Sequence, residues 1–386
     1  MPSLLNWFSQ VAAVVRFGLL SIPQRRGSVL AALMGIAGVV GVLIGVLSMA
    51  AGFRHTMAAS SSPDSAIVLR SGANDEMSSG LGQDETRLLA EAPGLARGTE
   101  GPLASAELFV IINLPKRSTG TDANVPLRGV EQAAFRVREK FKLDRGRSFQ
   151  SGRNEVIVGA GAAQEFMGLD LGNKFKVGRN EWEVVGIFSA GGGTAESEIW
   201  TDAPVLQGAF HRGNSFQSVY ARLASPGAFL QFSNSVSGDP RLNVRAIRQA
   251  DFYAEQSTLL NTLIKTLGYL IASLMAVGAV FGALNTMYNS VSSRSREIAT
   301  LRALGFGSGA VVASVMLEAL AVALVGGVLG ATIAYLAFNG FHTATVNWQS
   351  FSQVTFAFQV TPSLLAQGIL WASIIGLFGG PKNPLG

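Results

Sequence analysis

Long apolar segments alternate with polar segments along the chain, and the apolar ones have the length of membrane-spanning helices. A helix needs about 20 mainly apolar residues to cross the hydrocarbon core of a bilayer. No charged residue occurs between Arg26 and Arg54. Similar apolar segments lie at residues 266–293, 303–340 and 361–380. The pattern predicts four spans, and the first is expected to be an uncleaved anchor because it is much longer than a signal-peptide core.

The segment between the first two apolar runs has a different pattern, with short runs that are typical of strands. Strands are predicted at residues 65–70, 106–114, 124–130 and 216–223, and strand, short helix and strand at residues 154–177. Residues 174–188 are predicted as a hairpin with Gly178, Arg179 and Asn180 in its turn. The sequence therefore predicts an α-helical membrane protein with four transmembrane helices and a large α+β extracytoplasmic domain inserted between helices 1 and 2.

Boundaries follow from these patterns. We expect an N-terminal cytoplasmic or interfacial segment at 1–27, helix 1 at 28–53, the extracytoplasmic domain at 54–250, and a stalk helix at 251–265 continuous with helix 2 at 266–290. A charged cytoplasmic helix follows at 291–308, then helix 3 at 309–338, an extracytoplasmic loop at 339–360, helix 4 at 361–380 and a C-terminal tail at 381–386. Helix 4 is the shortest of the predicted spans, because Thr361 and Pro362 form a good helix start and few apolar residues follow.

The distribution of Lys and Arg predicts the orientation, because cytoplasmic loops are enriched in both. Arg16, Arg25 and Arg26 precede the first span, and three arginines lie between the second and third spans. The loop at 339–360 has neither Lys nor Arg. Both termini and the charged helix are therefore expected in the cytoplasm.

Composition agrees with a membrane protein and disfavours a soluble enzyme. The 386 residues are 48% hydrophobic and only 14% charged. The net charge of +5 needs no nucleic acid, because arginines at the inner face each gain roughly 1 kcal/mol from anionic lipid. Each predicted span also carries two glycines four residues apart, which favours a tightly packed bundle: Gly41 and Gly45, Gly278 and Gly282, Gly326 and Gly330, Gly376 and Gly380.

Motifs for catalysis or cofactor binding are absent from the sequence. It contains no phosphate loop of the G-x-x-x-x-G-K-[ST] kind and no G-x-S-x-G nucleophile motif. The string "GAGAAQ" from Gly159 lacks the third glycine of a dinucleotide loop and is interpreted as a turn after a strand. His55, His211 and His342 do not stand at ligand spacing from one another. We therefore predict neither a metal nor a cofactor.

The string "SRSREIATLRALGFG" after the second span combines charges with an apolar stripe formed by Ile298, Leu301 and Leu304. With "EALAVALVGGVLG" in the third span, it resembles the signature of MacB/FtsX-type ABC transporter permeases. The string "EVIVGAGAAQEFMGLDLGNKFKVGRNEWEVVGIF" resembles their extracytoplasmic domain, and "GALNTMYNSV" resembles the end of their second span. The likeness covers nearly the whole chain, and it implies a DevC-like permease without a fused ATPase.

This resemblance implies a homodimer that works with two copies of a separate ATPase, which binds the ATP. Motion would pass along the stalk helices to the outer domain rather than open a tunnel, a mode called mechanotransmission. The residues implied to contact the ATPase are Arg294, Arg296, Glu297, Ile298, Leu301, Arg302 and Gly305. An interface within the membrane is expected at Glu318, Gly326, Gly327 and Gly330. A carboxylate in a span costs about 2.5–3.5 kcal/mol, so Glu318 should face protein. We favour a structural role over a proton relay, since the family pattern has this acid without proton coupling.

The function expected from these residues is that of a non-catalytic permease subunit of an ABC-type exporter or extractor in the inner membrane. A periplasmic adaptor and an outer-membrane channel are further partners that the resemblance implies. The alternative is an FtsX-like signalling protein or scaffold that activates an extracytoplasmic partner such as a cell-wall hydrolase. A secondary transporter is less favoured, because four spans with one acid leave little for an ion pathway.

Overall fold

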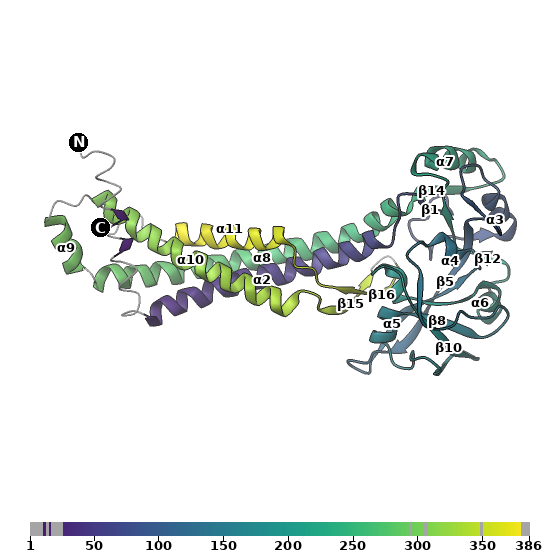
Figure 1. Ribbon diagram of the computed structural model, residues 1–386, viewed down its shortest axis with the longest axis horizontal. Helices are drawn as coiled ribbons and strands as arrows, with labels where there is room; N and C mark the ends of the chain where they lie inside the picture. Colours follow the sequence, from purple (N-terminus) through teal and green to yellow (C-terminus); the bar gives the residue numbers. More distant parts are fainter. Residues whose placement is uncertain are drawn as a thin grey trace. The chain divides into compact units, whose positions relative to one another are not determined.

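The computed structural model describes residues 11–12, 15–16, 26–293, 295–303, 308–347 and 350–379 (Figure 1). The predicted tail at 381–386 and most of the segment at 1–27 lie outside these residues. The chain divides into two units. The first, here called the helical unit, comprises Met1–Ala51, Thr262–Phe341 and Phe358–Gly386. The second, the sheet unit, comprises Gly52–Asn261 and His342–Ala357.

Among the described residues, three long helices and two shorter ones lie wholly or partly in the helical unit. They are α2 (Arg26–Ala59), α8 (Gln249–Ser293), α9 (Ser295–Ala303), α10 (Ser308–Phe338) and α11 (Pro362–Phe378). The stretches Arg26–Ala59, Gln249–Asn285 and Val312–Phe338 are long and apolar enough to cross a bilayer, whereas α11, with 17 residues, is a shorter apolar helix. The side chain of Thr361 caps α11 by accepting a hydrogen bond from the Leu364 amide at 3.4 Å.

The helices α2, α8, α10 and α11 run side by side and share one apolar core (Figure 1). Its buried members include Val40 and Ile44 of α2, Ala276 of α8, Ala323 of α10 and Ile375 of α11. The outward faces are also apolar, since Leu274, Phe281 and Leu336 are 68%, 66% and 77% exposed. Apolar side chains on both faces of a helix are typical of a bundle that meets lipid rather than water.

The charged segment predicted as a helix at 291–308 is described in two parts, the end of α8 up to Ser293 and α9 at Ser295–Ala303, and residues 294 and 304–307 lie outside the described residues. The stalk helix expected at 251–265 is the first part of α8, which is one continuous helix of 45 residues.

A 10-stranded mixed sheet forms the centre of the sheet unit, in the order β14-β1-β13-β5-β6-β11-β8-β10-β7, with β9 paired to β10. Its strands are β1 (Ser65–Arg70), β5 (Ala104–Pro115), β6 (Asp122–Val130), β7 (Lys142–Gly146), β8 (Glu155–Gly159), β9 (Lys174–Val177), β10 (Asn180–Ser189), β11 (Ile199–Asp202), β13 (Ser218–Arg222) and β14 (Val244–Arg248). The pairs β6 with β11 and β8 with β10 are parallel, and the other pairs are antiparallel.

The remaining elements of the sheet unit are short. The helices are α3 (Gln83–Ala90), α4 (Ala134–Val137), α5 (Ala160–Glu165), α6 (Ala203–Ala209) and α7 (Phe229–Gly238), with the 3₁₀ helices η2 (Thr194–Ser197) and η3 (Pro226–Ala228). Two-residue strands are β2 (Leu81–Gly82), β3 (Arg97–Gly98), β4 (Gly101–Pro102) and β12 (Ser215–Phe216).

The strands expected from the sequence are confirmed at β1, β5, β6, β8, β9, β10 and β13. The predicted hairpin is β9–β10, in which Asn180 already pairs with Val177, so its turn is shorter than expected.

Besides a cluster that gathers Phe149, Phe188 and Trp200, two apolar cores lie against different parts of this sheet. One gathers Val68 of β1, Leu89 of α3 and Phe232 of α7. The other gathers Val158 of β8, Trp182 of β10 and residues of β6 and α6. The long strand β5 contributes to both, because its first residues belong to the former core and its later residues to the latter. The two halves of the sheet unit therefore meet at β5 and its neighbour β6.

A hairpin occupies the segment that the sequence analysis assigned to a loop at 339–360. It consists of β15 (His342–Asn347) and β16 (Ser352–Ala357), and it packs on the sheet unit. The hydroxyl groups of Ser197 and Thr355 are 2.8 Å apart, and the Thr355 amide donates to the Ser197 hydroxyl at 2.9 Å. A Cβ on Gly161 would lie 2.1 Å from the Thr355 hydroxyl oxygen, so glycine permits this close approach.

Candidate functional site

The predicted ATPase-contact residues cluster in and around α9. Arg296 is an exposed residue of α9, and its backbone carbonyl accepts a hydrogen bond from the Thr300 hydroxyl at 2.9 Å. Glu297, Ile298, Leu301 and Arg302 also lie in α9, but their side chains are outside the described part of the structure, as are Arg294 and Gly305 entirely. The helix itself therefore carries most of the predicted set, and the assignment stays a prediction.

The predicted interface residues of the third span lie in α10 at contacts between helices. A Cβ on Gly330 would lie 2.4 Å from the Ala37 carbonyl oxygen of α2, and one on Gly326 would lie 3.1 Å from the Leu33 carbonyl oxygen. Gly327 faces a different helix, since its Cβ would lie 2.6 Å from the Cβ of Ala372 in α11. The three glycines thus bring α10 against α2 on one side and α11 on the other.

Glu318 is the acidic residue of the same helix, about two turns before these glycines. It is 3% exposed, so the carboxyl lies inside the helical unit. This location agrees with the expectation that an acid in this span faces protein. Burial alone does not assign it a role.

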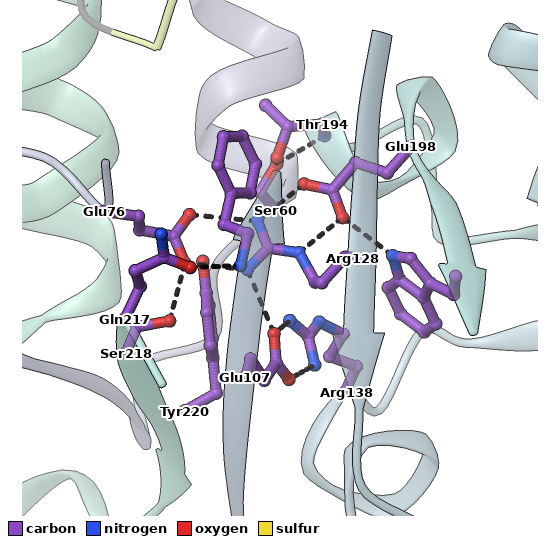
Figure 2. Close-up of polar contacts among 12 residues, drawn as sticks. Ser60, Glu76, Glu107, Arg128, Arg138, Thr194, Glu198, Gln217, Ser218 and Tyr220 are labelled. Atoms are coloured by element: carbon purple, nitrogen blue, oxygen red, sulfur yellow. Dashed lines mark hydrogen bonds and ion pairs between the residues drawn. The ribbon is translucent and has the colours of Figure 1, made fainter. Parts of the chain in front are cut away.

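A buried ionic cluster, which the sequence analysis did not identify, lies where the two halves of the sheet unit meet (Figure 2). We call it the Arg128 cluster. Its members are Arg128 of β6, Glu107 of β5, Glu76 before β2, Glu198 before β11 and Arg138 after α4. Ser218 of β13 adds a hydroxyl that donates to Glu76 at 2.6 Å.

Every N–H group of the Arg128 guanidinium donates to a carboxylate. Two bonds of 2.7 and 2.9 Å go to Glu76, two of 2.8 Å go to Glu198, and one of 3.0 Å goes to Glu107. Arg138 then forms a two-pronged pair with Glu107 at 2.6 and 2.7 Å. Such paired, planar contacts are the strong form of the charged hydrogen bond. The cluster therefore ties five separate segments of the chain to one another.

Aromatic rings enclose the two guanidinium groups. The Cζ of Arg128 lies 4.8 Å from the centre of the Phe109 ring and 5.3 Å from that of Tyr220. The Cζ of Arg138 lies 4.3 Å from the Tyr220 ring and 4.7 Å from the Trp200 ring, whose indole N–H donates to Glu198 at 2.7 Å. Rings at this distance attract the cations and exclude water from them.

The environment keeps Glu76 and Arg128 charged. Burial alone raises the pKa of the Glu76 carboxyl, but the charge and hydrogen bonds of Arg128 outweigh burial, and the pKa lies below its ordinary value. Burial alone lowers the pKa of the Arg128 guanidinium, but Glu198 and Glu76 outweigh it and raise that pKa. Burial raises the pKa of the Tyr220 hydroxyl, so this ring stays neutral.

Small pockets adjoin the Arg128 cluster on the sheet unit. One is lined by the serines that follow α2, by Arg138 and Lys140, and by Tyr253 at the start of α8. At its edge the Ser60 hydroxyl accepts a hydrogen bond from the Thr194 amide at 2.6 Å. Among the described residues, no group of three or more His, Cys, Asp or Glu is placed to hold a metal ion.

Two family models match successive parts of the chain. A family model described as the MacB-like periplasmic core domain matches residues 29–237. A second, described as the FtsX-like permease C-terminal, matches residues 269–381.

Three known proteins resemble parts of this chain. The macrolide export ATP-binding/permease protein MacB of Chromobacterium violaceum is 30% identical over 111 residues, which are 29% of this chain and 16% of that protein. The extracellular domain of the transporter YknZ from Gram-positive bacteria covers 47% of this chain and 99% of its own, at 16% identity and a TM-score of 0.36. The periplasmic region of MacB from Actinobacillus actinomycetemcomitans covers 50% of this chain and 93% of its own, at 12% identity and a TM-score of 0.38.

The family matches define the class of protein, because the first covers more than half of the chain. It is an ABC-type permease of the MacB/FtsX kind. The chain belongs to the MacB/FtsX family, with a MacB-like periplasmic core domain followed by an FtsX-like C-terminal region.

Proposed function

We propose that this chain is the membrane permease subunit of an ABC-type exporter or extractor, and that a separate ATPase drives it. The observation that carries the proposal is the order of the two regions along the chain. A MacB-like periplasmic core domain precedes an FtsX-like region, and the apolar helices α2 and α8 each contribute residues to both the helical and the sheet unit. A continuous helix can transmit a displacement along its axis, so ATP-driven motion at one end would reach the outer domain.

The topology that we propose has four spans, α2, α8, α10 and α11, in the inner membrane. The residues at 54–250 and the loop at 339–360 lie outside the cytoplasm, and the segment at 291–308 lies inside it. The chain has no cysteine, so a single introduced cysteine reports its own location. Asn180→Cys should react with an impermeant thiol reagent in intact cells, and Ser308→Cys should not. The reverse labelling pattern would overturn the orientation.

The ATPase contact that we propose is α9 with its flanking residues, which are Arg294, Arg296, Glu297, Ile298, Leu301, Arg302 and Gly305. Removing one partner of a buried charged contact costs about 2–5 kcal/mol. Glu297→Lys should therefore reduce co-purification of the ATPase, or permease-dependent ATP hydrolysis, at least tenfold without preventing membrane insertion. The control is Glu181→Lys, which makes the same charge change at a half-exposed residue of β10.

Normal ATPase binding and full export by Glu297→Lys would contradict the coupling role of α9. We further propose that two copies of the chain assemble with two ATPases, together with a periplasmic adaptor and an outer-membrane channel. Co-purification with a cell-wall hydrolase in place of an adaptor would instead favour the signalling function. The purified chain alone should not hydrolyse ATP, because its sequence contains no phosphate loop.

A further inference from the structure

A second pocket beside the Arg128 cluster lies entirely within the sheet unit. Three parts of the unit line it. The sheet contributes Phe109 and the Arg128 cluster, the start of α8 contributes Phe252 and Gln256, and the hairpin β15–β16 contributes Gln353. The hairpin is fixed against α8, because the Asn347 side-chain amide donates to the Gln256 side-chain oxygen at 2.9 Å.

The charges around this pocket leave a negative excess. The Arg128 cluster contains two guanidinium groups and three carboxylates, and all N–H groups of Arg128 are already used within it. Arg128 therefore has no donor left for an anionic ligand. The carboxylates of Glu76 and Glu198 line the pocket, and each accepts three hydrogen bonds from described residues, whereas a carboxylate can accept about four.

An unsatisfied acceptor is the second observation that points to a ligand. Gln353 lines the pocket and is 8% exposed. Its side-chain oxygen is buried and has no hydrogen-bond partner among the residues that the structure describes. A buried polar atom without a partner costs about 1–3 kcal/mol, so native proteins normally pair such atoms. A ligand with a hydrogen-bond donor or a positive charge would therefore stabilise the Gln353 side-chain oxygen.

Aromatic side chains complete the wall. Phe252 and Tyr253 line the pocket and their rings meet edge to face with centres 5.4 Å apart, whereas the Phe109 ring already contacts the Arg128 guanidinium. The faces of such rings attract ammonium groups. Acceptors of net negative charge combined with aromatic walls are the surroundings that recognise a compact cation rather than an anion or a neutral apolar group.

We propose that the pocket formed by the Arg128 cluster, the start of α8 and the hairpin β15–β16 binds a compact monovalent cation of the size of an ammonium group. The ammonium group of a primary amine and a free alkali ion share this chemistry. Gln353 supplies a neutral acceptor, and Glu76 and Glu198 supply the charge. The proposal does not depend on the ATPase or on export, since every group that it uses belongs to the sheet unit.

Saturation-transfer NMR on the full chain in maltoside micelles tests the proposal, with methylammonium as the probe. Tetramethylammonium, which lacks N–H groups and is larger, keeps the ionic strength constant and serves as the negative probe. We expect saturation transfer to methylammonium and not to tetramethylammonium. Addition of K⁺ then distinguishes the two sources. Displacement of methylammonium by equimolar K⁺ identifies a free alkali ion as an occupant, and its retention identifies an amine.

The matched variants are Gln353→Met and Gln231→Met, which make the same replacement in the pocket and on the exposed surface of α7. Gln353→Met should weaken methylammonium binding about tenfold, which corresponds to about 1.4 kcal/mol, and Gln231→Met should leave it unchanged. Without the cation, Gln353→Met should be at least as stable as the parent in thermal unfolding, because it removes an unpaired buried acceptor. Equal signals for both probes, or unchanged binding by a folded Gln353→Met protein, would overturn the proposal.

Discussion

The helical unit and the sheet unit of this chain are packed by side chains of different size. In the helical unit several of the closest contacts between helices are made by glycine and alanine. Cβ atoms on Gly327 and Gly376 would lie 2.6 Å from the Cβ atoms of Ala372 and Ala323. In the sheet unit the largest fully buried side chains include Trp182, and a cluster of rings joins Phe188 to Trp200 with centres 4.5 Å apart.

The surroundings of each unit explain this difference. Hydrocarbon solvates an apolar side chain as well as a protein interior does, so helices in lipid associate by close backbone packing between small residues. In water, burial of apolar surface contributes about 25 cal/mol per Å², and large rings bury the most surface for each residue. The same chain therefore follows two packing rules, and the change in residue size along the sequence indicates where each applies.

The two units also differ in the charged residues that they bury. The sheet unit buries the Arg128 cluster, whose members satisfy one another, whereas Glu318 is the buried acid of α10 in the helical unit. A cluster that is buried and mutually paired is costly to disturb, because removal of one member leaves the others charged in a medium of low dielectric constant.

The largest effect is expected from Arg128→Met. The substitution leaves three buried carboxylates without their shared cation, and we expect the free energy of unfolding to fall by about 3–5 kcal/mol. The control is Arg117→Met. Arg117 forms an ion pair of 2.8 Å with Asp170, but their side chains are 37% and 59% exposed, so the expected loss is about 0–1 kcal/mol.

Thermal unfolding of the full chain, followed by tryptophan fluorescence, compares the two variants, because Trp182 and Trp200 are buried in the sheet unit. Equal losses for both arginines would mean that the Arg128 cluster contributes no more to stability than a surface ion pair.

A smaller but still clear effect is expected from Gly330→Ala in the helical unit. The new Cβ would lie 2.4 Å from the Ala37 carbonyl oxygen and 2.9 Å from its Cα, so the backbones of α2 and α10 must move apart. Overpacking of this kind costs about 1–3 kcal/mol. The loss should appear as a lower midpoint when the micelle-bound chain is unfolded with sodium dodecyl sulfate and its helicity is followed by circular dichroism.

Gly278→Ala is the matched control within the same unit. No atom of the described chain lies within 4 Å of a Cβ at Gly278, and alanine is the better helix former by up to about 1 kcal/mol. This variant should keep or raise the midpoint. If both variants behaved alike, close glycine contacts would not be what holds the helices together.

Much of this architecture could be predicted from the sequence, because its signals are local. Long apolar runs predict helices such as α2 and α10, and alternating runs predict strands such as β1 and β10. The hairpin β15–β16 was missed because its strands are rich in polar residues, so the alternation is weak. Propensity alone does not separate such a hairpin from a loop.

The Arg128 cluster could not be assembled from the sequence, because its members are far apart in the chain and meet only through sheet pairing. Phe109 pairs with Arg128 between β5 and β6, and this register brings Glu107 and Arg128 close together. A local signal did exist, since Glu107 and Arg128 each interrupt an otherwise apolar predicted strand. Charges inside buried strands predict paired partners, although they do not say which partners. The pairing of α10 glycines with α2 or α11 likewise depends on the bundle rather than on their spacing.

The smallest effect is a pH dependence that should be specific to the sheet unit. Hydrogen bonds from Arg147 at 2.7 and 2.8 Å and from the Gln150 amide lower the pKa of the Glu155 carboxyl from 4.5 to about 2. Between about pH 4.5 and pH 2 the unfolded chain therefore binds more protons at this carboxyl than the folded chain does. The stability from Glu155 is fully present above about pH 4.5 and is lost as the pH falls through about 2.

Glu155→Gln should lower the unfolding midpoint at pH 7 and make its decline between pH 4.5 and 2 shallower than in the parent. Glu181→Gln, in which a half-exposed carboxylate stands 3.9 Å from Lys174, should leave the profile unchanged. Urea unfolding at a series of pH values, followed by tryptophan fluorescence, gives both profiles, and an unaltered slope in Glu155→Gln would assign the acid sensitivity to other carboxylates.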